Sequence, residues 1–155
     1  MSNIEYLPFD QANPADLLTI LNQDSIRTHL IQHPEFDQVS LEQWMASKIE
    51  LDKQPSYRVR AVYIDGDLAG WCALQPDEQG VELAIVIAQG YWGAGVKIFK
   101  TMMGWAKECG HSQVVFHLLD TRREYRSLNK LAHRVYRTEM LNRTFTTYLF
   151  PTSIF

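Results

Sequence analysis

The stretch Val81-Glu-Leu-Ala-Ile-Val-Ile-Ala-Gln-Gly-Tyr-Trp-Gly-Ala-Gly-Val96 decides how this chain folds. Residues 81–88 are apolar except for Glu82, as expected of a strand that is buried on both faces. Three glycines follow with the spacing Gly90-x-x-Gly93-x-Gly95, and apolar residues then recur with helical spacing. The stretch therefore predicts a buried strand, a glycine-containing turn and an amphipathic helix that ends near Gly110.

A strand, a glycine turn and a helix in this order can bind phosphate groups. Glycine lets the backbone approach an anion without an intervening Cβ atom, and the first N–H groups of the helix point toward it. A Rossmann dinucleotide site needs Gly-x-Gly-x-x-Gly, which reverses the spacing seen here. A Walker phosphate loop needs Gly-Lys-Ser/Thr at its end, where this chain has Gly95-Val-Lys97. A tight turn without a ligand is the third interpretation, and the spacing alone leaves all three open.

The rest of the chain predicts further strands and helices around this stretch. Asn13-Pro14 marks a helix start, Ser40 and Gln43 form a weak capping box, and Asp65-Gly-Asp67 predicts a hairpin turn. A strand–helix–strand unit usually has parallel strands, whereas short turns connect antiparallel ones. Strands are expected at 4–9, 57–64, 68–74, 81–88, 113–119 and 142–150. One helix is expected to begin at residue 14, and further helices are expected at 25–31, 40–52, 96–108 and 124–138.

The segment Gly90-Tyr-Trp-Gly-Ala-Gly95 resembles the acetyl-CoA-binding turn of the GNAT acetyltransferases, and looks most like the branch that acetylates ribosomal-protein N-termini. Asn129, Ala132 and Tyr136 fall in register with that family's Asn-x-x-Ala-x-x-x-Tyr pattern. The resemblance covers nearly the whole chain. It implies a single α+β domain over residues 1–155, with three α/β/α layers and a mixed, mostly antiparallel sheet that contains a splayed parallel strand pair.

The resemblance also implies an acetyl-CoA site between the splayed strands 81–88 and 113–119. Backbone groups of Ile85, Val86 and Ile87 would pair with the pantetheine like an added strand. An N–H group near Ile87 could polarise the acetyl carbonyl, and Asn129 could hydrogen-bond CoA. The pyrophosphate would be held by the N–H groups of Tyr91, Trp92, Gly93, Ala94, Gly95 and Val96.

Two residues are candidates for the chemistry of acetyl transfer. Glu82 is the only charge in its strand, and since desolvation strengthens a carboxylate as a base, it could deprotonate the attacking amine. Its alternative is an ion pair with Arg58 or Arg60 across the sheet. Tyr136 could protonate or hydrogen-bond the departing CoA thiolate. Its alternative is a core aromatic residue on an amphipathic helix.

Histidines and arginines supply weaker candidates. His117 is expected in the core, although in the cleft it could replace Glu82 as the base. His29 and His33 lie in the loop region between the first helices, which commonly forms a wall of the acceptor pocket in this fold. Arg122-Arg123 could reach the adenosine 3′-phosphate or form a solvated loop.

The composition narrows the class of protein. The chain has 155 residues, 46% of them apolar, and a net charge of −3, which predicts one domain with a sizeable core. Because no basic block, signal peptide or long apolar run is present, we expect a cytoplasmic protein without nucleic-acid or membrane partners. Cys72 and Cys109 form no metal-ligand pattern, and no metal is expected.

The expected activity is transfer of an acetyl group from acetyl-CoA to a primary amine, which is either a small molecule or a peptide N-terminus. The enzyme would be a monomer or a homodimer. Two other classes stay open. One is a non-catalytic acyl-CoA-binding or regulatory module, favoured by Gly90, Met140 and Leu141, where the family pattern has other residues. The other is a protein-interaction domain that has lost the cofactor.

Overall fold

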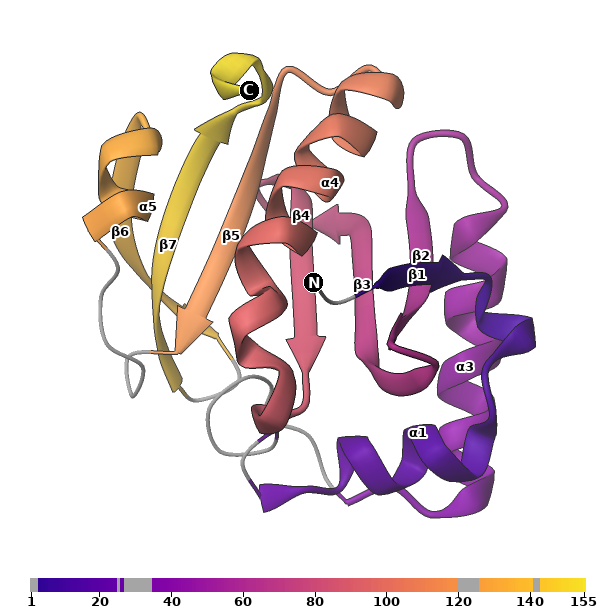
Figure 1. The fold of residues 1–155 in the computed structure, drawn as a ribbon. Coiled ribbons are helices and arrows are strands. Elements are labelled where there is room, and N and C mark those ends of the chain that lie inside the picture. Colours follow the sequence, from indigo (N-terminus) through magenta and orange to yellow (C-terminus); the bar gives the residue numbers. More distant parts are fainter. Residues whose placement is uncertain (1–2, 25, 27–34, 120–125, 141–142) are drawn as a thin grey trace.

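A computed structural model of the chain describes residues 3–24, 26, 35–119, 126–140 and 143–155. Its strands form one seven-stranded sheet in the order β1-β2-β3-β4-β5-β7-β6 (Figure 1). Neighbouring strands are antiparallel except β4 and β5, which run parallel. The predicted fold class is therefore confirmed.

The strands and helices follow one another along the chain largely in the order that the sequence predicts. The strands are β1 (Ile4–Leu7), β2 (Arg58–Ile64), β3 (Asp67–Asp77), β4 (Gly80–Ile87), β5 (Gln113–Leu119), β6 (Arg134–Met140) and β7 (Arg143–Pro151). The α-helices are α1 (Pro14–Leu21), α3 (Gln38–Asp52), α4 (Gly95–Glu108) and α5 (Arg126–Leu131). Short 3-10 helices are η1 (Phe9–Gln11), η2 (Gln89–Ala94) and η3 (Thr152–Ile154).

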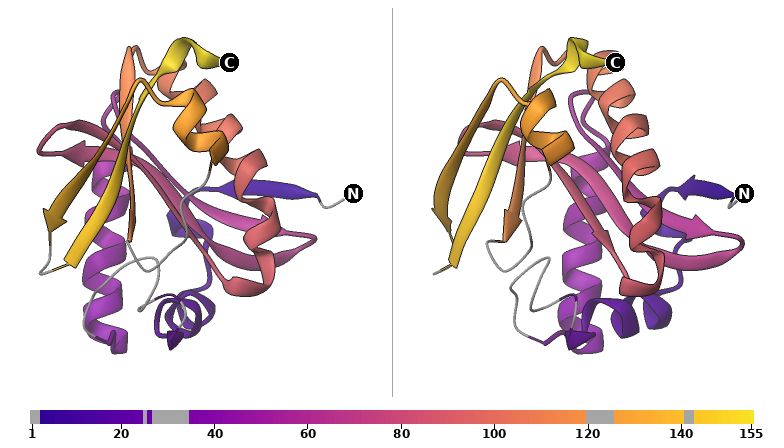
Figure 2. Two further views of the ribbon diagram at one scale, coloured as in Figure 1. Left: turned by 90° about the vertical axis from the view of Figure 1, so that its left-hand side faces the viewer. Right: turned by 60° about the vertical axis from the view of Figure 1, so that its left-hand side comes forward.

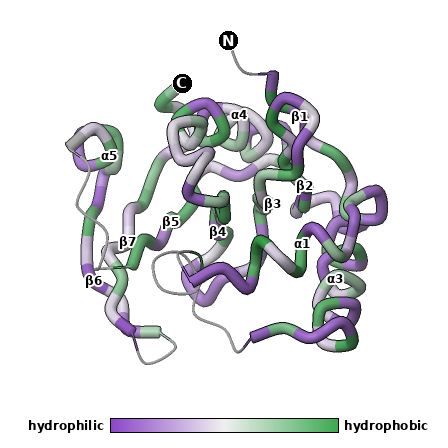
Figure 3. The backbone as a smooth tube through the Cα atoms, turned by 60° about the horizontal axis from the view of Figure 1, so that its bottom comes forward, coloured by the Kyte–Doolittle hydropathy of each residue, from purple (hydrophilic) through white to green (hydrophobic). Residues whose placement is uncertain are grey.

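Helices α4 and α3 lie on opposite faces of the sheet (Figure 2). Helix α4 packs on one face through Ile98, Met102 and Met103, which are fully buried. On the other face, α1 and α3 bury Leu17 and Leu41. Hydrophobic and hydrophilic residues are interspersed along α3 (Figure 3), and the helix buries Leu41 and Met45. None of the described helices is long and apolar enough to cross a lipid bilayer.

Helices α1 and α3 begin with side-chain caps. The Asn13 side chain accepts hydrogen bonds from the first turn of α1, with Pro14 at the first helical position, as predicted. Helix α3 begins two residues earlier than predicted. Its cap is Asp37, whose side chain accepts from the Ser40 N–H at 2.7 Å, while the Ser40 hydroxyl accepts from the Asp37 N–H at 3.0 Å.

A tight turn between β2 and β3 and a close approach of β3 to β4 shape the antiparallel meander β2–β3–β4. Asp65 and Gly66 both have positive φ angles, 51° and 87°, which confirms the predicted hairpin turn. Further along β3, a Cβ atom on Gly70 would lie 2.0 Å from the Val86 carbonyl oxygen. Glycine is therefore required where β3 and β4 approach each other, close to the carboxyl end of β4.

The expected helix at 124–138 is wrong beyond Leu131. Helix α5 ends there, and Arg134–Met140 forms the edge strand β6, which pairs with β7 along its whole length. Exposed and half-buried residues alternate along most of β6, the period of a strand with one face on the protein. The ladder to β7 supplies hydrogen bonds that are distant in sequence, and these outweigh the weak local helical pattern.

Candidate functional site

Strands β4 and β5 separate as soon as they meet. Among the described residues, Glu82 and Val115 are the only pair between them. Beyond this point the two strands diverge toward their carboxyl ends (Figure 1). On its other edge, β4 stays paired with β3 along its whole length. The predicted splayed parallel pair is present, and it leaves one edge of β4 facing a gap.

Strand alternation decides which groups of β4 face this gap. The Ala88 N–H donates to the Ala69 carbonyl of β3 at 2.8 Å. Along a strand, the backbone N–H and C=O groups of every second residue point to the same neighbouring strand. The backbone groups of Val86, two residues before Ala88, are therefore also directed to β3. The backbone groups of Ile85 and Ile87 are directed the other way, toward β5. Two of the three residues predicted to pair with the pantetheine are thus oriented to do so.

A cavity of about 430 Å³ lies between α4, α5 and the diverging strands. This is within the size range of small-molecule sites, about 300–1,000 Å³. Its walls are largely apolar. The lining residues are Ile85, Ile87, Trp92, Gly95, Val96, Phe99, Lys100, Phe116, Leu118, Ser127, Leu128, Leu131 and Phe155.

The glycine-containing segment is helical, where the sequence predicts a turn. Helix η2 passes directly into α4 at Gly95, whose φ of −56° and ψ of −39° are helical. Gly90 and Gly93 also lack a positive φ, so the backbone conformation does not require glycine at these positions. A Cβ atom added at Gly95 would meet no other atom within 4 Å, and Gly95 lines the cavity. The missing side chain therefore leaves room for a ligand beside the backbone.

The start of α4 carries no side-chain cap from the described residues. Ala94 occupies the N-cap position there. The Gly95 N–H donates to the Trp92 carbonyl of η2, and the positive end of the α4 dipole lies next to the cavity at Gly95 and Val96. The Trp92 indole N–H donates to the Ile87 carbonyl at 2.9 Å and ties η2 to the end of β4.

The structure brings together part of the predicted cofactor-binding set. Ile85, Ile87, Trp92, Gly95 and Val96 all line the cavity. The remaining members are not among the lining residues. The side chain of Val86 is buried on the opposite face, Tyr91, Gly93 and Ala94 lie in η2, and Asn129 is exposed on α5.

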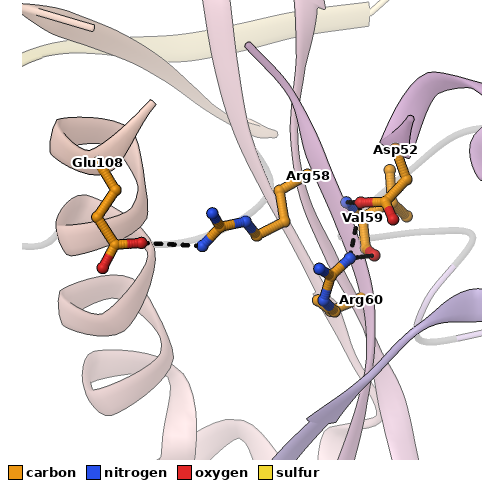
Figure 4. A network of polar contacts seen from close by, with 5 residues as sticks. All are labelled: Asp52, Arg58, Val59, Arg60 and Glu108. Carbon is orange, nitrogen blue, oxygen red and sulfur yellow. Dashed lines mark hydrogen bonds and ion pairs between the residues drawn. The ribbon is translucent and has the colours of Figure 1, made fainter. Parts of the chain in front are cut away.

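Glu82 points to the face of the sheet opposite the cavity, toward α3. Its Oε1 accepts a hydrogen bond from Gln75 Nε2 at 2.9 Å. The alternative of an ion pair with Arg58 or Arg60 is wrong. Arg58 pairs with a carboxylate on α4 and Arg60 with one at the end of α3 (Figure 4).

Tyr136 lies on the edge strand β6 and not on a helix. It is half-buried, pairs with Thr147 of β7 and is not among the residues that line the cavity. The Arg134 guanidinium lies 4.7 Å from the centroid of its ring. The helical face that would have directed Tyr136 toward the cofactor is absent, because α5 ends at Leu131. Its role as an acid stays a prediction from the sequence.

His117 lies in the core, as predicted, on the same face of the sheet as Glu82. Its Nδ1 is 2.8 Å from the Thr147 hydroxyl, and its Nε2 is 3.2 Å from Asp77 Oδ1. The Thr147 hydroxyl in turn donates to the Thr138 hydroxyl at 2.7 Å. This row of polar groups connects the end of β3 with β5, β7 and β6.

Several weaker candidates fall outside the described residues. They are His29, His33, Arg122 and Arg123, together with Leu141 and most of the short helix predicted at 25–31.

The sequence analysis missed other residues of the site. Phe116 and Leu118 alternate along β5 and reach the cavity together, a spacing visible in the sequence. Leu128 and Leu131 are one helical turn apart on α5. Phe155 lies far away in sequence, and no local pattern indicates its contact.

Comparisons with known proteins agree with this architecture. The family model of the acetyltransferase (GNAT) family matches residues 18–140. No curated protein matches the chain.

Solved structures share the fold at low sequence identity. The acetyltransferase of the GNAT family from Streptococcus pneumoniae is 16% identical, with a TM-score of 0.66 over 96% of each chain. The N-acetyltransferase from Staphylococcus aureus Mu50 is 12% identical, with a TM-score of 0.68 over 99% of each chain. The protein yncA from Salmonella typhimurium, solved with its cofactor acetyl-CoA, is 15% identical, with a TM-score of 0.67 over 99% of this chain and 95% of that one.

Because the family model spans most of the chain, and the fold and the cavity agree with it, the protein belongs to the GNAT family of acetyltransferases, whose general activity is transfer of an acetyl group from acetyl-CoA.

Proposed function

We propose that this protein transfers the acetyl group of acetyl-CoA to a primary amine, which attacks the thioester directly. The observation that carries the proposal is the open space at Gly95, where an apolar cavity meets the uncapped start of α4. Such a place suits a ligand with an extended apolar arm and an anionic group.

The residues present fit CoA, which would supply the activated acetyl thioester. The backbone groups of Ile85 and the N–H group of Ile87 would bind the pantetheine arm as an added strand, because they are directed into the gap beside β4, while the Ile87 carbonyl accepts from Trp92. The pyrophosphate would lie beside the positive end of the α4 dipole, where the absence of a Cβ atom at Gly93 and Gly95 allows close approach. Lys100 places a positive charge on the wall of the same cavity.

Glu82 would act from the other face of the sheet. An amine must be neutral to attack a thioester, so a carboxylate near the reacting nitrogen accelerates the reaction by taking up its proton. Glu82 lies where β4 and β5 meet, on the face covered by α3. The amine would therefore enter from the α3 face while CoA binds from the α4 face. Protonation of the departing thiolate by Tyr136 and a CoA contact from Asn129 stay sequence-based proposals.

The acceptor would be a small-molecule amine or a peptide N-terminus. The likeness of Gly90-Tyr-Trp-Gly-Ala-Gly95 to the ribosomal branch of the family favours the peptide N-terminus. The protein would act as a monomer or a homodimer in the cytoplasm.

Binding and turnover measured side by side test the proposal. Calorimetry should show acetyl-CoA binding, and mass spectrometry should show CoA release only when an accepted amine is present. The amine panel contains free amino acids, polyamines and short peptides with ribosomal-protein N-termini. Binding without release for every amine would indicate a non-catalytic acyl-CoA module. An absence of binding would indicate an interaction domain and overturn the proposal.

A further inference from the structure

A lysine reaches toward Glu82 from the helix that covers its face of the sheet. Lys48, on α3, donates from Nζ to Gln75 Oε1 at 2.6 Å, and Gln75 Nε2 donates to Glu82 Oε1 at 2.9 Å. The ammonium can only donate and the ionised carboxylate can only accept. The amide between them therefore has one satisfactory orientation, with its oxygen toward Lys48 and its nitrogen toward Glu82.

The surroundings of Lys48 hold its ammonium in place. Nζ lies 5.2 Å from the centroid of the Trp71 ring and 5.8 Å from that of Trp44, within the range of cation–π attraction. Trp71 is only 1% exposed, so its ring is fixed by the core. Burial lowers the pKa of Lys48, and the negative charge of Glu82 opposes that shift. The lysine and the carboxylate thus interact electrostatically as well as through Gln75.

The other charged groups near this face have partners of their own. Asp77, at the end of β3, contacts His117 on β5. Arg60 of β2 contacts Asp52 at the end of α3. The β5 residue that pairs with Glu82 is apolar. Lys48 is therefore the positively charged side chain that the described structure connects to Glu82, through Gln75.

We propose that Lys48 and Gln75 are positioning residues for Glu82, holding its carboxylate in one orientation for the attacking amine. Gln75 engages Oε1 and leaves Oε2 to take up the proton that the amine loses. The ammonium of Lys48 favours the ionised carboxylate, the form that a base needs. This inference rests on the proposed function, because it requires Glu82 as the base.

Four variants separate positioning from a merely structural role. Lys48→Met removes the charge at similar side-chain length, and Gln75→Leu removes the amide that connects the two ends. Lys48→Arg keeps the charge and serves as the conservative rescue. Lys53→Met is the matched control, because Lys53 caps the same helix but is exposed and pairs only with Glu50 in the described structure.

Two measurements are made on each variant. The first is kcat and KM as a function of pH, with acetyl-CoA affinity from calorimetry. The second is the ¹³C NMR chemical shift of the Glu82 carboxyl in the protein without ligand, which reports on the network independently of turnover.

We expect Lys48→Met and Gln75→Leu to lower kcat about tenfold at unchanged acetyl-CoA affinity, the usual effect of losing one hydrogen bond to a charged group. In Lys48→Met, the acid limb of the pH–rate profile should move to higher pH, and the ¹³C chemical shift of the Glu82 carboxyl should change, because the ammonium that attracts the carboxylate is gone. Lys48→Arg should restore most of the rate, and Lys53→Met should match the wild type.

The result that overturns the inference alone is a wild-type kcat and pH profile in Lys48→Met and Gln75→Leu, while Glu82→Gln is strongly impaired. If these variants lose only stability, the network is structural and the inference is equally wrong. If Glu82→Gln itself keeps the wild-type rate, the assignment of the base in the proposed function fails, and the positioning role fails with it.

Discussion

The two faces of the sheet present different groups at the point where β4 and β5 diverge. The α4 face is apolar and carries the cavity, with Ile85 and Ile87 in its wall. The α3 face carries Glu82 and His117, both hydrogen-bonded to neighbouring side chains. Successive residues of a strand point to opposite faces, so β4 supplies the cavity wall and the candidate base within six residues. Under the proposed function, the cofactor-binding residues and the candidate base would thus lie on the two faces of one strand.

This division implies that substitutions on the two faces act on different measurable quantities. Changes that fill the α4 side should weaken acetyl-CoA binding. Changes to the polar groups on the α3 side should alter turnover or stability at constant affinity for acetyl-CoA.

The largest effect is expected on the α4 face, from Gly95→Val. The protein has room for the new side chain, because a Cβ atom at this position meets nothing within 4 Å. The added methyl groups would instead occupy the space where the ligand approaches the helix start. We expect a folded protein with no acetyl-CoA binding detectable by calorimetry.

Gly104→Val is the matched control for this substitution. Gly104 also lies in α4 with open space around its Cβ position, but it is exposed and does not line the cavity. Both changes replace a helical glycine by valine, so their effects on helix stability should be similar. Wild-type affinity in a folded Gly95→Val protein would show that the glycine serves only the fold.

The second effect is expected on the α3 face, from Glu82→Gln. The amide keeps the size and one hydrogen-bond acceptor of the side chain but cannot take up a proton. We expect kcat to fall about 10²–10⁴-fold with acetyl-CoA affinity nearly unchanged, and the acid limb of the pH–rate profile to vanish. A parallel loss of affinity would contradict the separation of the two faces.

A smaller effect is expected from Thr147→Val in the His117 network. Thr147 is fully buried and connects His117 with Thr138, so removing its hydroxyl leaves two polar groups without this partner. We expect a loss of about 1–3 kcal/mol in the free energy of unfolding, measured from the denaturant midpoint. Thr146→Val is the control, because Thr146 is only half-buried and points to the other face of β7. A large fall in kcat without loss of stability would assign the network to catalysis instead.

The smallest effect concerns Tyr136→Phe, which removes only the phenolic oxygen. The catalytic role predicted from the sequence requires a marked fall in turnover at unchanged stability. The position of Tyr136 on the edge strand β6, with Arg134 over its ring, favours a change in kcat of less than about twofold. Steady-state kinetics of Tyr136→Phe, measured beside Glu82→Gln, distinguish the two, and a tenfold loss in kcat would support Tyr136 as the acid.

The segment from β4 to α4 was predictable because its signals are local. The apolar run, the glycine spacing and the helical periodicity each lie within a few residues of one another, and the observed bounds of β4 and α4 differ from the predicted ones by one residue. The segment after β5 was not predictable in the same way. Arg134–Met140 has a mixed local pattern, and its pairing with β7 decides that it is a strand.

The sequence by itself determined the order of most elements and the faces of their strands and helices, because periodicity is a property of neighbouring residues. Only the tertiary structure decided which side chains meet. Lys48 and Gln75 are 27 positions apart, and His117 and Asp77 are 40 apart. The cavity joins residues from Ile85 to Phe155. Such contacts depend on how the sheet pairs and how the helices pack on it, and no local pattern along the chain specifies them.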